Sequence, residues 1–202
     1  MLQHIGIDFD NTIVTYDRVF YKYALRMKLV TPRVKRDKQS IREAIRLLPG
    51  GNDRWTELQG LVYGRYMDEA ELMPGIESFL KACKERFFKV SIISHKTLYP
   101  FLGPRINLHL AAKRWFDKSG FLARFGLALS DVIFEETLKG KLKQISLSGC
   151  NYFIDDLVEV LAHPDFPRHV KKILYGSQVN KALLSGIKKL EDWNEIKEYF
   201  FC

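Results

Sequence analysis

Short apolar runs alternate with segments of helical periodicity along most of the chain. The runs are rich in Ile, Val and Phe, which is typical of buried strands, and lie near residues 4–8, 88–94, 131–134, 152–155 and 171–175. Segments with apolar positions at helical spacing separate them, at 76–85, 106–116, 141–147 and 158–163. Such alternation of strands and helices predicts an α/β fold with a parallel sheet core flanked by helices.

A long interval after the first strand breaks this rhythm. It has three further helical patterns, 19–29, 38–48 and 54–67, separated at Pro32 and at Pro49-Gly50. A simple crossover to a parallel neighbour does not need so much chain, so we predict an all-helical insertion over 16–72. The α/β core domain then comprises 1–15 and 73–202. Near the C-terminus, the apolar stripe of Leu183, Leu184, Ile187 and Leu190 predicts one or two helices over 179–200.

Composition narrows the class of protein. Hydrophobic residues make up 47% of the 202 residues, which is ordinary for a globular protein with a full core. The first strand begins almost at once, so no signal peptide is expected, and no apolar run approaches the roughly 18 residues of a membrane span. Cys83, Cys150 and Cys202 form no metal-binding or disulfide pattern. We therefore expect a cytoplasmic protein with reduced thiols and no membrane partner.

The net charge of +8 raises the question of an anionic partner. The densest basic cluster is Arg33-Val34-Lys35-Arg36-Asp37-Lys38. A solvated face is the interpretation that we favour, because runs of charge are usually solvated. The alternatives are attraction of a phosphorylated small molecule and binding of nucleic acid.

The strongest chemical signal is Asp8-Phe9-Asp10-Asn11-Thr12, directly after the first apolar run. Asp8 and Asp10 stand at the carboxyl end of a strand, where open α/β sheets bind their ligands. Because they are two residues apart, an extended backbone directs both side chains the same way. Their like charges repel unless a divalent cation or a shared proton lies between them. The alternative is a solvated turn that ends the strand.

Polar groups also end two later strands. Ser94-His95-Lys96 follows the second run, Asp155-Asp156 follows the fourth, and three lysines, Lys139, Lys141 and Lys143, lie between them. An acid pair, a hydroxyl, a lysine and a second acid pair, in this order, resemble the four motifs of the haloacid dehalogenase (HAD) superfamily of phosphohydrolases. The motifs extend from Asp8 to Glu159, so the resemblance covers most of the chain. It implies a Rossmann-like core, and a helical cap between the first two motifs matches the predicted insertion.

The resemblance assigns a role to each motif. It makes Asp8 the nucleophile and a Mg²⁺ ligand, and it makes Asp10 the general acid and base, whose backbone carbonyl also reaches the metal. Ser94 would donate a hydrogen bond to a phosphate oxygen. Lys141 best fits the lysine that neutralises the phosphoryl charge, with Lys139 as the runner-up and Lys143 too far into the helix. Asp155 would be the main magnesium ligand.

Four further residues have open roles. Asp156 could bind the metal directly or through water. Glu159 matches a third acidic residue of many family members, or it is a surface residue of a helix's first turn. His95 and Lys96 either face the ligand or are solvated.

The resemblance implies a magnesium-dependent phosphatase that hydrolyses a small phosphomonoester, such as a sugar phosphate or nucleotide, through an aspartyl-phosphate. Asp10 argues against a dehalogenase, which lacks this second Asp. A phosphomutase, a phosphatase acting on a nucleic-acid end and a catalytically silent scaffold are the alternatives. In the cap, Trp55, Gln59 and Tyr63 share a helix face near Arg54 and Arg65. That face is either a packing stripe, which we favour, or a surface that selects the substrate.

Overall fold

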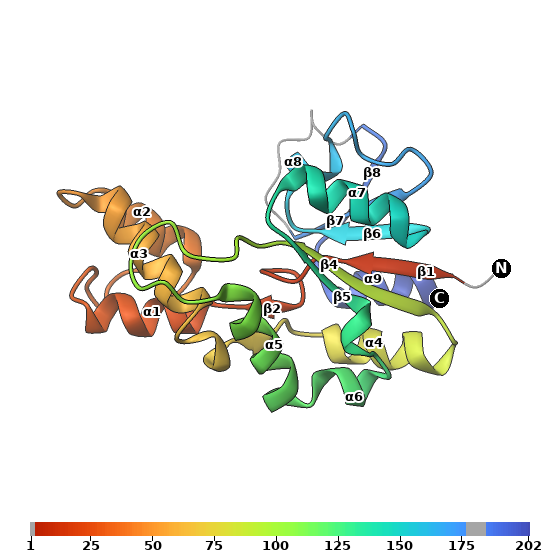
Figure 1. Cartoon of the computed structure of the whole chain (residues 1–202), viewed down its shortest axis with the longest axis horizontal. Coiled ribbons are helices and arrows are strands. Elements are labelled where there is room, and N and C mark those ends of the chain that lie inside the picture. The colour runs from red at the N-terminus through yellow and green to blue at the C-terminus, as the bar shows by residue number, and fades with distance from the viewer. Residues whose placement is uncertain (1–2, 177–184) are drawn as a thin grey trace. The chain divides into compact units, whose positions relative to one another are not determined.

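The computed structural model describes residues 3–176 and 185–202, and its contacts divide the chain into two compact units (Figure 1). The core unit comprises Met1–Val14, Leu72–Lys96 and Phe121–Cys202, and the helical unit comprises Thr15–Glu71 and Thr97–Gly120. The segment 97–120, which the sequence pattern assigned to the core, thus groups with the inserted helices. Its helix makes the difference, because the Trp115 indole donates a hydrogen bond to the Ala70 carbonyl at 3.0 Å.

The core unit is built on a six-stranded sheet whose neighbouring strands all pair in parallel. The order across the sheet is β5 (Val132–Glu135), β4 (Lys89–His95), β1 (His4–Ile7), β6 (Tyr152–Asp155), β7 (Lys171–Tyr175) and β8 (Ile187–Leu190). The predicted α/β class is therefore confirmed. In the central register, Ile7 pairs with Ile92 on one side and with Ile154 on the other. The carboxyl ends of β1, β4 and β6 consequently meet at one edge of the sheet.

Helices cover both faces of this sheet (Figure 1). On one face lie α7 (Leu138–Ser148) and α8 (Val158–Leu161), whose buried Leu142, Ile145 and Leu161 join one apolar cluster with Phe153 of β6. On the other face lies α4 (Ile76–Glu85), which packs with α9 (Trp193–Phe201) through the rings of Phe79 and Trp193, 5.0 Å apart. The short α6 (Phe121–Phe125) and η2 (Leu129–Asp131) lead into β5.

The C-terminal prediction was wrong in one part. Residues Ile187–Leu190 form the edge strand β8 instead of a helix, and Trp193–Phe201 forms the helix α9. Pairing with the open edge of β7 satisfies this backbone, and such tertiary pairing overrides local periodicity. Asp192 then starts α9, where its side chain accepts hydrogen bonds from the backbone of Asn194 and Glu195. The predicted stretch 179–184 lies outside the described residues.

The helical unit contains α1 (Asp17–Arg26), α2 (Lys38–Arg46), α3 (Gly51–Tyr63), η1 (Met67–Glu69) and α5 (Leu108–Ser119). Aromatic rings fill its interior: Phe20 stacks on Trp55 with centroids 4.9 Å apart, and Tyr63 meets Phe20 edge-on. Trp55 is only 3% exposed. Two short strands, β2 (Val14–Thr15) and β3 (Glu71–Leu72), pair where the chain passes between the units.

Two other expectations concern the whole chain. None of the helices formed by the described residues is long and apolar enough to cross a membrane. All three cysteines are free thiols, with Cys83 and Cys150 buried and Cys202 exposed.

Candidate active site

The turn after β1 holds the first pair of carboxylates. Phe9 is fully buried and meets the Phe134 ring edge-on at 5.9 Å, Asp8 is also buried, and Asp10 is partly buried. Asn11 turns the chain with a φ of 60°, a left-handed conformation that asparagine tolerates well. The Trp193 indole donates a hydrogen bond to the Thr12 carbonyl at 2.9 Å, so the first residue of α9 helps to hold this turn in place. The two carboxylates contact different lysines: Asp8 Oδ1 lies 2.6 Å from Lys141 Nζ, and Asp10 Oδ2 lies 2.6 Å from Lys96 Nζ.

A buried lysine joins the first acid pair to the second. Lys141 Nζ lies 2.6 Å from Asp8 Oδ1 and 2.6 Å from Asp155 Oδ2, and the lysine is 1% exposed. Lys139 and Lys143 are both exposed. Of the three lysines that the sequence offered, the structure thus brings Lys141 to the acid pairs.

The start of α7 explains how Lys141 reaches this position. The helix begins at Leu138, three residues before the predicted segment 141–147, and Thr137 caps it by accepting the Gly140 N–H at 3.0 Å. A Cβ on Gly140 would lie 2.5 Å from Glu135 Oε2 and 3.2 Å from Glu135 Cβ. The missing side chain therefore lets the first turn pack closely against the end of β5, and Lys141 follows on the buried face.

The electrostatics of this cluster favour a charged lysine between two carboxylates. Burial alone would lower the pKa of Lys141, but attraction to Asp8 and Asp155 outweighs burial and raises that pKa. Burial raises the pKa of Asp155, while Lys141 opposes the shift and Asp8 adds to it. Lys141 thus faces two carboxylates, Asp8 and Asp155, and does not fully offset the repulsion between them. A second cation would reduce the repulsion that is left.

Asp156 completes a group of oxygen donors. Carboxylate oxygens of Asp8, Asp155 and Asp156 lie within 4.8 Å of one another. Asp155 Oδ1 also accepts the Leu157 N–H at 2.9 Å, and Thr12 Oγ1 donates to Asp156 Oδ1 at 3.3 Å, so second contacts orient both side chains. Hard carboxylate oxygens at this spacing suit Mg²⁺.

The cluster adds the carboxylate of Asp156 to the two carboxylates, Asp8 and Asp155, that the sequence predicted as metal ligands. The sequence placed Asp10 among the metal ligands through its backbone carbonyl and left Asp156 open. In the structure, the carboxylates that gather include that of Asp156, while Asp10 Oδ2 binds Lys96 Nζ at 2.6 Å. The side chain of Asp10 is therefore held by a cation of its own.

Lys96 is the residue whose involvement the sequence left undecided. It is 4% exposed and follows Ser94, which is 1% exposed, at the end of β4. Residues two apart on an extended chain face the same way, so Lys96 is expected to share the direction of Ser94. His95 instead faces solvent, with Nε2 3.1 Å from the Glu136 carbonyl. The two-residue spacing from Ser94 was the sequence signal that could have distinguished the buried Lys96 from the exposed His95.

Glu159 does not join the cluster. It is exposed in the first turn of α8, and the Lys141 ammonium forms ion pairs with Asp8 and Asp155. This position fits the alternative of a surface acid that favours the positive end of a helix.

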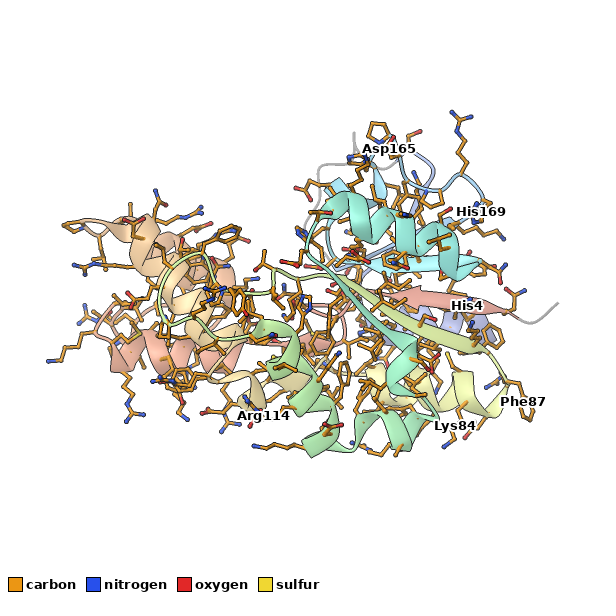
Figure 2. All side chains as sticks on the ribbon, in the orientation of Figure 1. His4, Lys84, Phe87, Arg114, Asp165 and His169 are labelled. Carbon is orange, nitrogen blue, oxygen red and sulfur yellow. The ribbon has the colours of Figure 1, made fainter. Side chains whose placement is uncertain are left out.

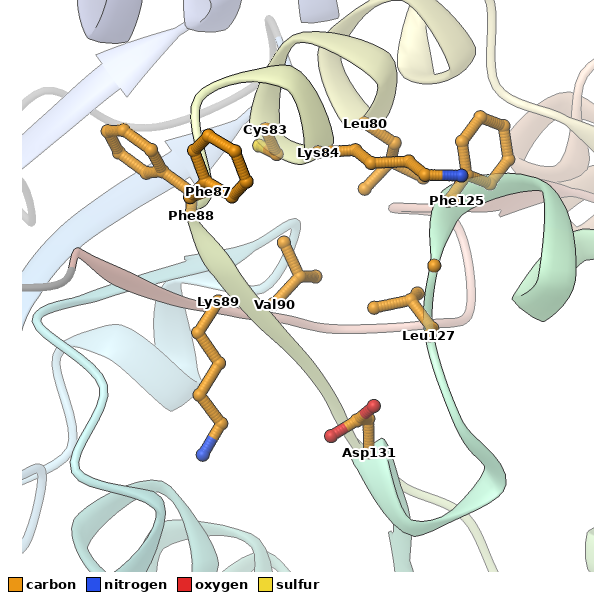
Figure 3. Close-up of a pocket in the computed structure, with 11 residues that line it drawn as sticks. Leu80, Cys83, Lys84, Phe87, Phe88, Lys89, Val90, Phe125, Leu127 and Asp131 are labelled. Carbon is orange, nitrogen blue, oxygen red and sulfur yellow. The ribbon is translucent and has the colours of Figure 1, made fainter.

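A cavity of about 360 Å³ lies elsewhere in the core unit (Figure 3). It is lined by the end of α4 and the beginning of β4, and none of the predicted site residues lines it. Two of its polar groups are engaged locally: Lys84 Nζ donates to the Arg124 carbonyl, and Asp131 Oδ2 accepts the Ala128 N–H. We therefore place the candidate active site at the carboxylate cluster.

Solved structures with the same arrangement of elements identify the fold. A HAD-superfamily hydrolase from Ehrlichia chaffeensis is 15% identical over 98% of this chain and 97% of its own, with a TM-score of 0.55. A haloacid dehalogenase-like protein from Streptococcus pneumoniae is 13% identical over 98% of both chains, with a TM-score of 0.61. The chain has the HAD-superfamily fold. No protein-family model matches the sequence, and no curated protein matches it.

One further HAD structure contains ligands. The protein from Deinococcus radiodurans, with a TM-score of 0.59 and 11% identity over 98% of this chain and 95% of its own, has bound phosphate and sodium. The fold expected from the four ordered motifs is therefore confirmed.

Proposed function

We propose that this HAD-fold protein is a magnesium-dependent phosphatase that hydrolyses phosphomonoesters through an aspartyl-phosphate on Asp8. The observation that supports this function best is the double contact of Lys141 with Asp8 and Asp155, beside the donor group completed by Asp156. The carboxylates at the ends of β1 and β6 would hold a divalent cation, and that cation together with Lys141 would neutralise the charge of a dianionic substrate. One of the similar structures is called a predicted phosphoglycolate phosphatase, from Haemophilus somnus.

In the first step, an Asp8 carboxylate oxygen attacks phosphorus and the bond from phosphorus to the leaving oxygen breaks. Asp10 gives its proton to that oxygen, so the product leaves as an alcohol. Lys141 offsets the negative charge of the carboxylate and of the transferring phosphoryl group, and Ser94 donates a hydrogen bond to a phosphate oxygen.

In the second step, Asp10 takes a proton from water, and the water oxygen attacks the phosphorus bound to Asp8. The bond between phosphorus and Asp8 breaks, which releases inorganic phosphate and restores the carboxylate. Asp10 thus alternates between acid and base, and its contact with Lys96 at 2.6 Å fixes where its carboxylate lies.

Asp8, Asp155 and Asp156 would hold magnesium, with the Asp10 carbonyl as the further ligand that the resemblance implies. When bound, Mg²⁺ supplies positive charge at the phosphate oxygens and thereby reduces their repulsion of an anionic nucleophile. The protein's own part is to fix the donors, through Thr12 on Asp156 and the Leu157 N–H on Asp155.

The substrate class to test first is a small phosphomonoester, such as a sugar phosphate or nucleotide. The helix face of Trp55, Gln59 and Tyr63 was one candidate for selecting the substrate. Trp55 is stacked inside the helical unit, which argues against that role. Tyr63 also packs against Tyr16, with ring centroids 4.8 Å apart. These contacts support the packing interpretation of the face. A phosphomutase uses the same residues and differs only in passing the phosphoryl group to another hydroxyl.

The function is tested with a panel of phosphomonoesters, including a small aryl phosphate, with and without magnesium. Turnover should disappear with a chelator and return with Mg²⁺, and Ca²⁺ should substitute poorly because it prefers more ligands at longer distances. Asp155→Ala should sharply raise the magnesium concentration needed for half-maximal rate. Phosphate release that persists in excess chelator would reject the metal-dependent mechanism, and absence of release on the whole panel would favour a silent scaffold.

A second prediction concerns Lys96, which the HAD resemblance did not assign. Lys96→Met should lower kcat by about 10- to 100-fold, because a poorly positioned general acid and base loses much of its contribution. KM should change little, and Lys96→Arg should restore part of the rate. Lys139→Met, which removes an exposed cation, is the matched control. An unchanged kcat in correctly folded Lys96→Met would make the ion pair with Asp10 purely structural.

A further inference from the structure

The positive charge of this protein is concentrated in one unit. The helical unit has 16 Lys and Arg against nine Asp and Glu, whereas the core unit has 16 against 15. Within the helical unit, residues 18–46 alone contain ten Lys and Arg and two Asp and Glu, an excess of eight. This excess equals the net charge of the whole chain, +8. The segment 18–46, which we call the basic segment, therefore departs from the evenly scattered charge of a merely solvated protein.

The acids of the helical unit neutralise few of these cations. Glu71 pairs with Arg18, and Glu69 pairs with Lys22. Asp68 serves two cations outside the basic segment, Arg114 (Figure 2) and Lys118. Among the described residues, six exposed cations of the basic segment form no ion pair: Arg26, Lys28, Arg33, Lys35, Arg36 and Arg46.

The two acids within the basic segment are committed to local contacts. Asp37 caps α2 by accepting the Ser40 N–H and hydroxyl, and the backbone contact with Ser40 holds the pKa of Asp37 below its usual range despite some burial. Glu43 accepts a hydrogen bond from the Gln39 amide at 2.9 Å. Neither acid forms an ion pair with a cation of the basic segment, so its positive field persists.

One cation of α2 has a donor that is unsatisfied. The Nε of Arg42 is buried and has no hydrogen-bond partner within the described part of the protein. Buried polar atoms nearly always have a partner, and a guanidinium donor requires an acceptor. A phosphate oxygen is such an acceptor, and guanidinium groups bind phosphate with good geometry. Because this Nε is buried, an anion in solvent cannot reach it directly, and the case for an anionic partner depends on the exposed cations of the basic segment.

The contacts of α2 favour nucleic acid over a lipid surface. A helix that binds a bilayer inserts its apolar face, but Ile41 and Ile45 of α2 are fully buried within the protein. What remains outside comprises the exposed cations of the 27–37 connection and of the end of α2, with Leu47 as a single apolar residue at 88% exposure, and Arg36 lies over the Tyr21 ring at 4.9 Å from its centroid. Cations spread along a chain, with an aromatic ring among them, suit the repeated phosphates of a single strand.

We propose that the basic segment binds the backbone of a single-stranded nucleic acid, and that the substrate of the phosphatase is a phosphate at an end of such a strand. The inference rests on the proposed function for its second half. Because both units belong to one polypeptide, a strand bound by the basic segment raises the local concentration of its terminal phosphate. Longer strands then gain affinity from phosphates that are not hydrolysed.

The test measures hydrolysis of single strands of 2 to about 20 nucleotides that have a phosphate at the 5′ or 3′ end. KM should fall at least about tenfold with length while kcat stays constant, since the added phosphates contribute binding alone. Binding of an unphosphorylated 20-mer should weaken steeply with salt, because each neutralised phosphate of a single strand contributes about −0.7 to the slope.

A charge-reversed variant shows whether the basic segment is responsible. Arg33→Glu/Lys35→Glu/Arg36→Glu changes the connection between α1 and α2, outside both helices. The matched control, Lys81→Glu/Arg168→Glu/Lys188→Glu, makes the same change of charge at exposed positions of the core unit. The first variant should lose the length dependence and about two units of salt slope, while the control should lose little. If the reversed variant does not fold, Arg33→Gln/Lys35→Gln/Arg36→Gln replaces it.

The outcomes separate this inference from the proposed function. Hydrolysis of an aryl phosphate with no effect of strand length would overturn the inference and leave the phosphatase standing. Salt-dependent strand binding that requires the basic segment, without hydrolysis of any phosphate, would support the surface and reject the phosphatase. Equal losses in the variant and its control, or tighter binding to vesicles of anionic lipid than to strands, would overturn the inference.

Discussion

Replacement of Asp8 by Asn should lower turnover by at least about a thousandfold, which corresponds to roughly 4 kcal/mol in the activation free energy. The amide keeps the shape of the side chain but removes the charge that attacks phosphorus. It also removes one of the three carboxylates that gather within 4.8 Å, so magnesium should bind more weakly. The loss should appear on every substrate, because Asp8 attacks the phosphoryl group that all phosphomonoesters share.

The control for Asp8→Asn is Asp165→Asn, which changes an exposed acid of the core unit (Figure 2). Both variants should give the circular dichroism spectrum of the native protein, and only the first should lose activity. Because Asn still offers an oxygen to Lys141, the buried contact is weakened but not abolished. Near-normal turnover by folded Asp8→Asn would reject the covalent mechanism.

Much of this site could be predicted because it depends on two short-range rules. Period-two alternation predicts that Asp8 and Asp10 share one side of an extended chain with Phe9 opposite, and Phe9 is indeed fully buried. Parallel strands then bring their carboxyl ends together, so groups 147 residues apart, such as Asp8 and Asp155, become neighbours once β1 and β6 pair. The order of the acid pairs, hydroxyl and lysine was sufficient to choose the fold.

The features that the sequence missed depend on long-range pairing. Ile187–Leu190 shows a helical stripe but becomes a strand because the edge of β7 offers backbone partners. The segment 97–120 groups with the helical unit because of contacts such as Trp115 with Ala70, which no local pattern reveals. Local spacing could have indicated that Lys96 faces inward, but its partner Asp10 lies 86 residues away in the sequence. Each of these contacts forms only when segments that are distant in the sequence come together in the fold.

The second large effect is expected at Lys141, because its removal leaves two acids buried without their cation. Lys141→Met keeps the length and apolar stem of the side chain, which lies near the Phe153 ring, but removes the ammonium that contacts Asp8 and Asp155. Turnover should fall by about 100- to 1000-fold on all substrates, as when one preorganised donor is removed from a developing negative charge. The free energy of unfolding should also fall by about 3–5 kcal/mol, the usual cost of breaking one side of a buried ion pair.

The stability loss and the activity loss can be separated with magnesium. Without metal, Lys141→Met should unfold at a lower temperature than the native protein, because Asp8 and Asp155 repel each other at 6% and 0% side-chain exposure. A divalent cation at the same oxygens would relieve that repulsion, so Mg²⁺ should raise the melting temperature of Lys141→Met more than that of the native protein. Lys143→Met, an exposed lysine two residues further along α7, should show neither effect. If magnesium stabilised Lys141→Met no more than the native protein, the acids would not be a shared site for the two cations, and Lys141 would act as a structural ion pair alone.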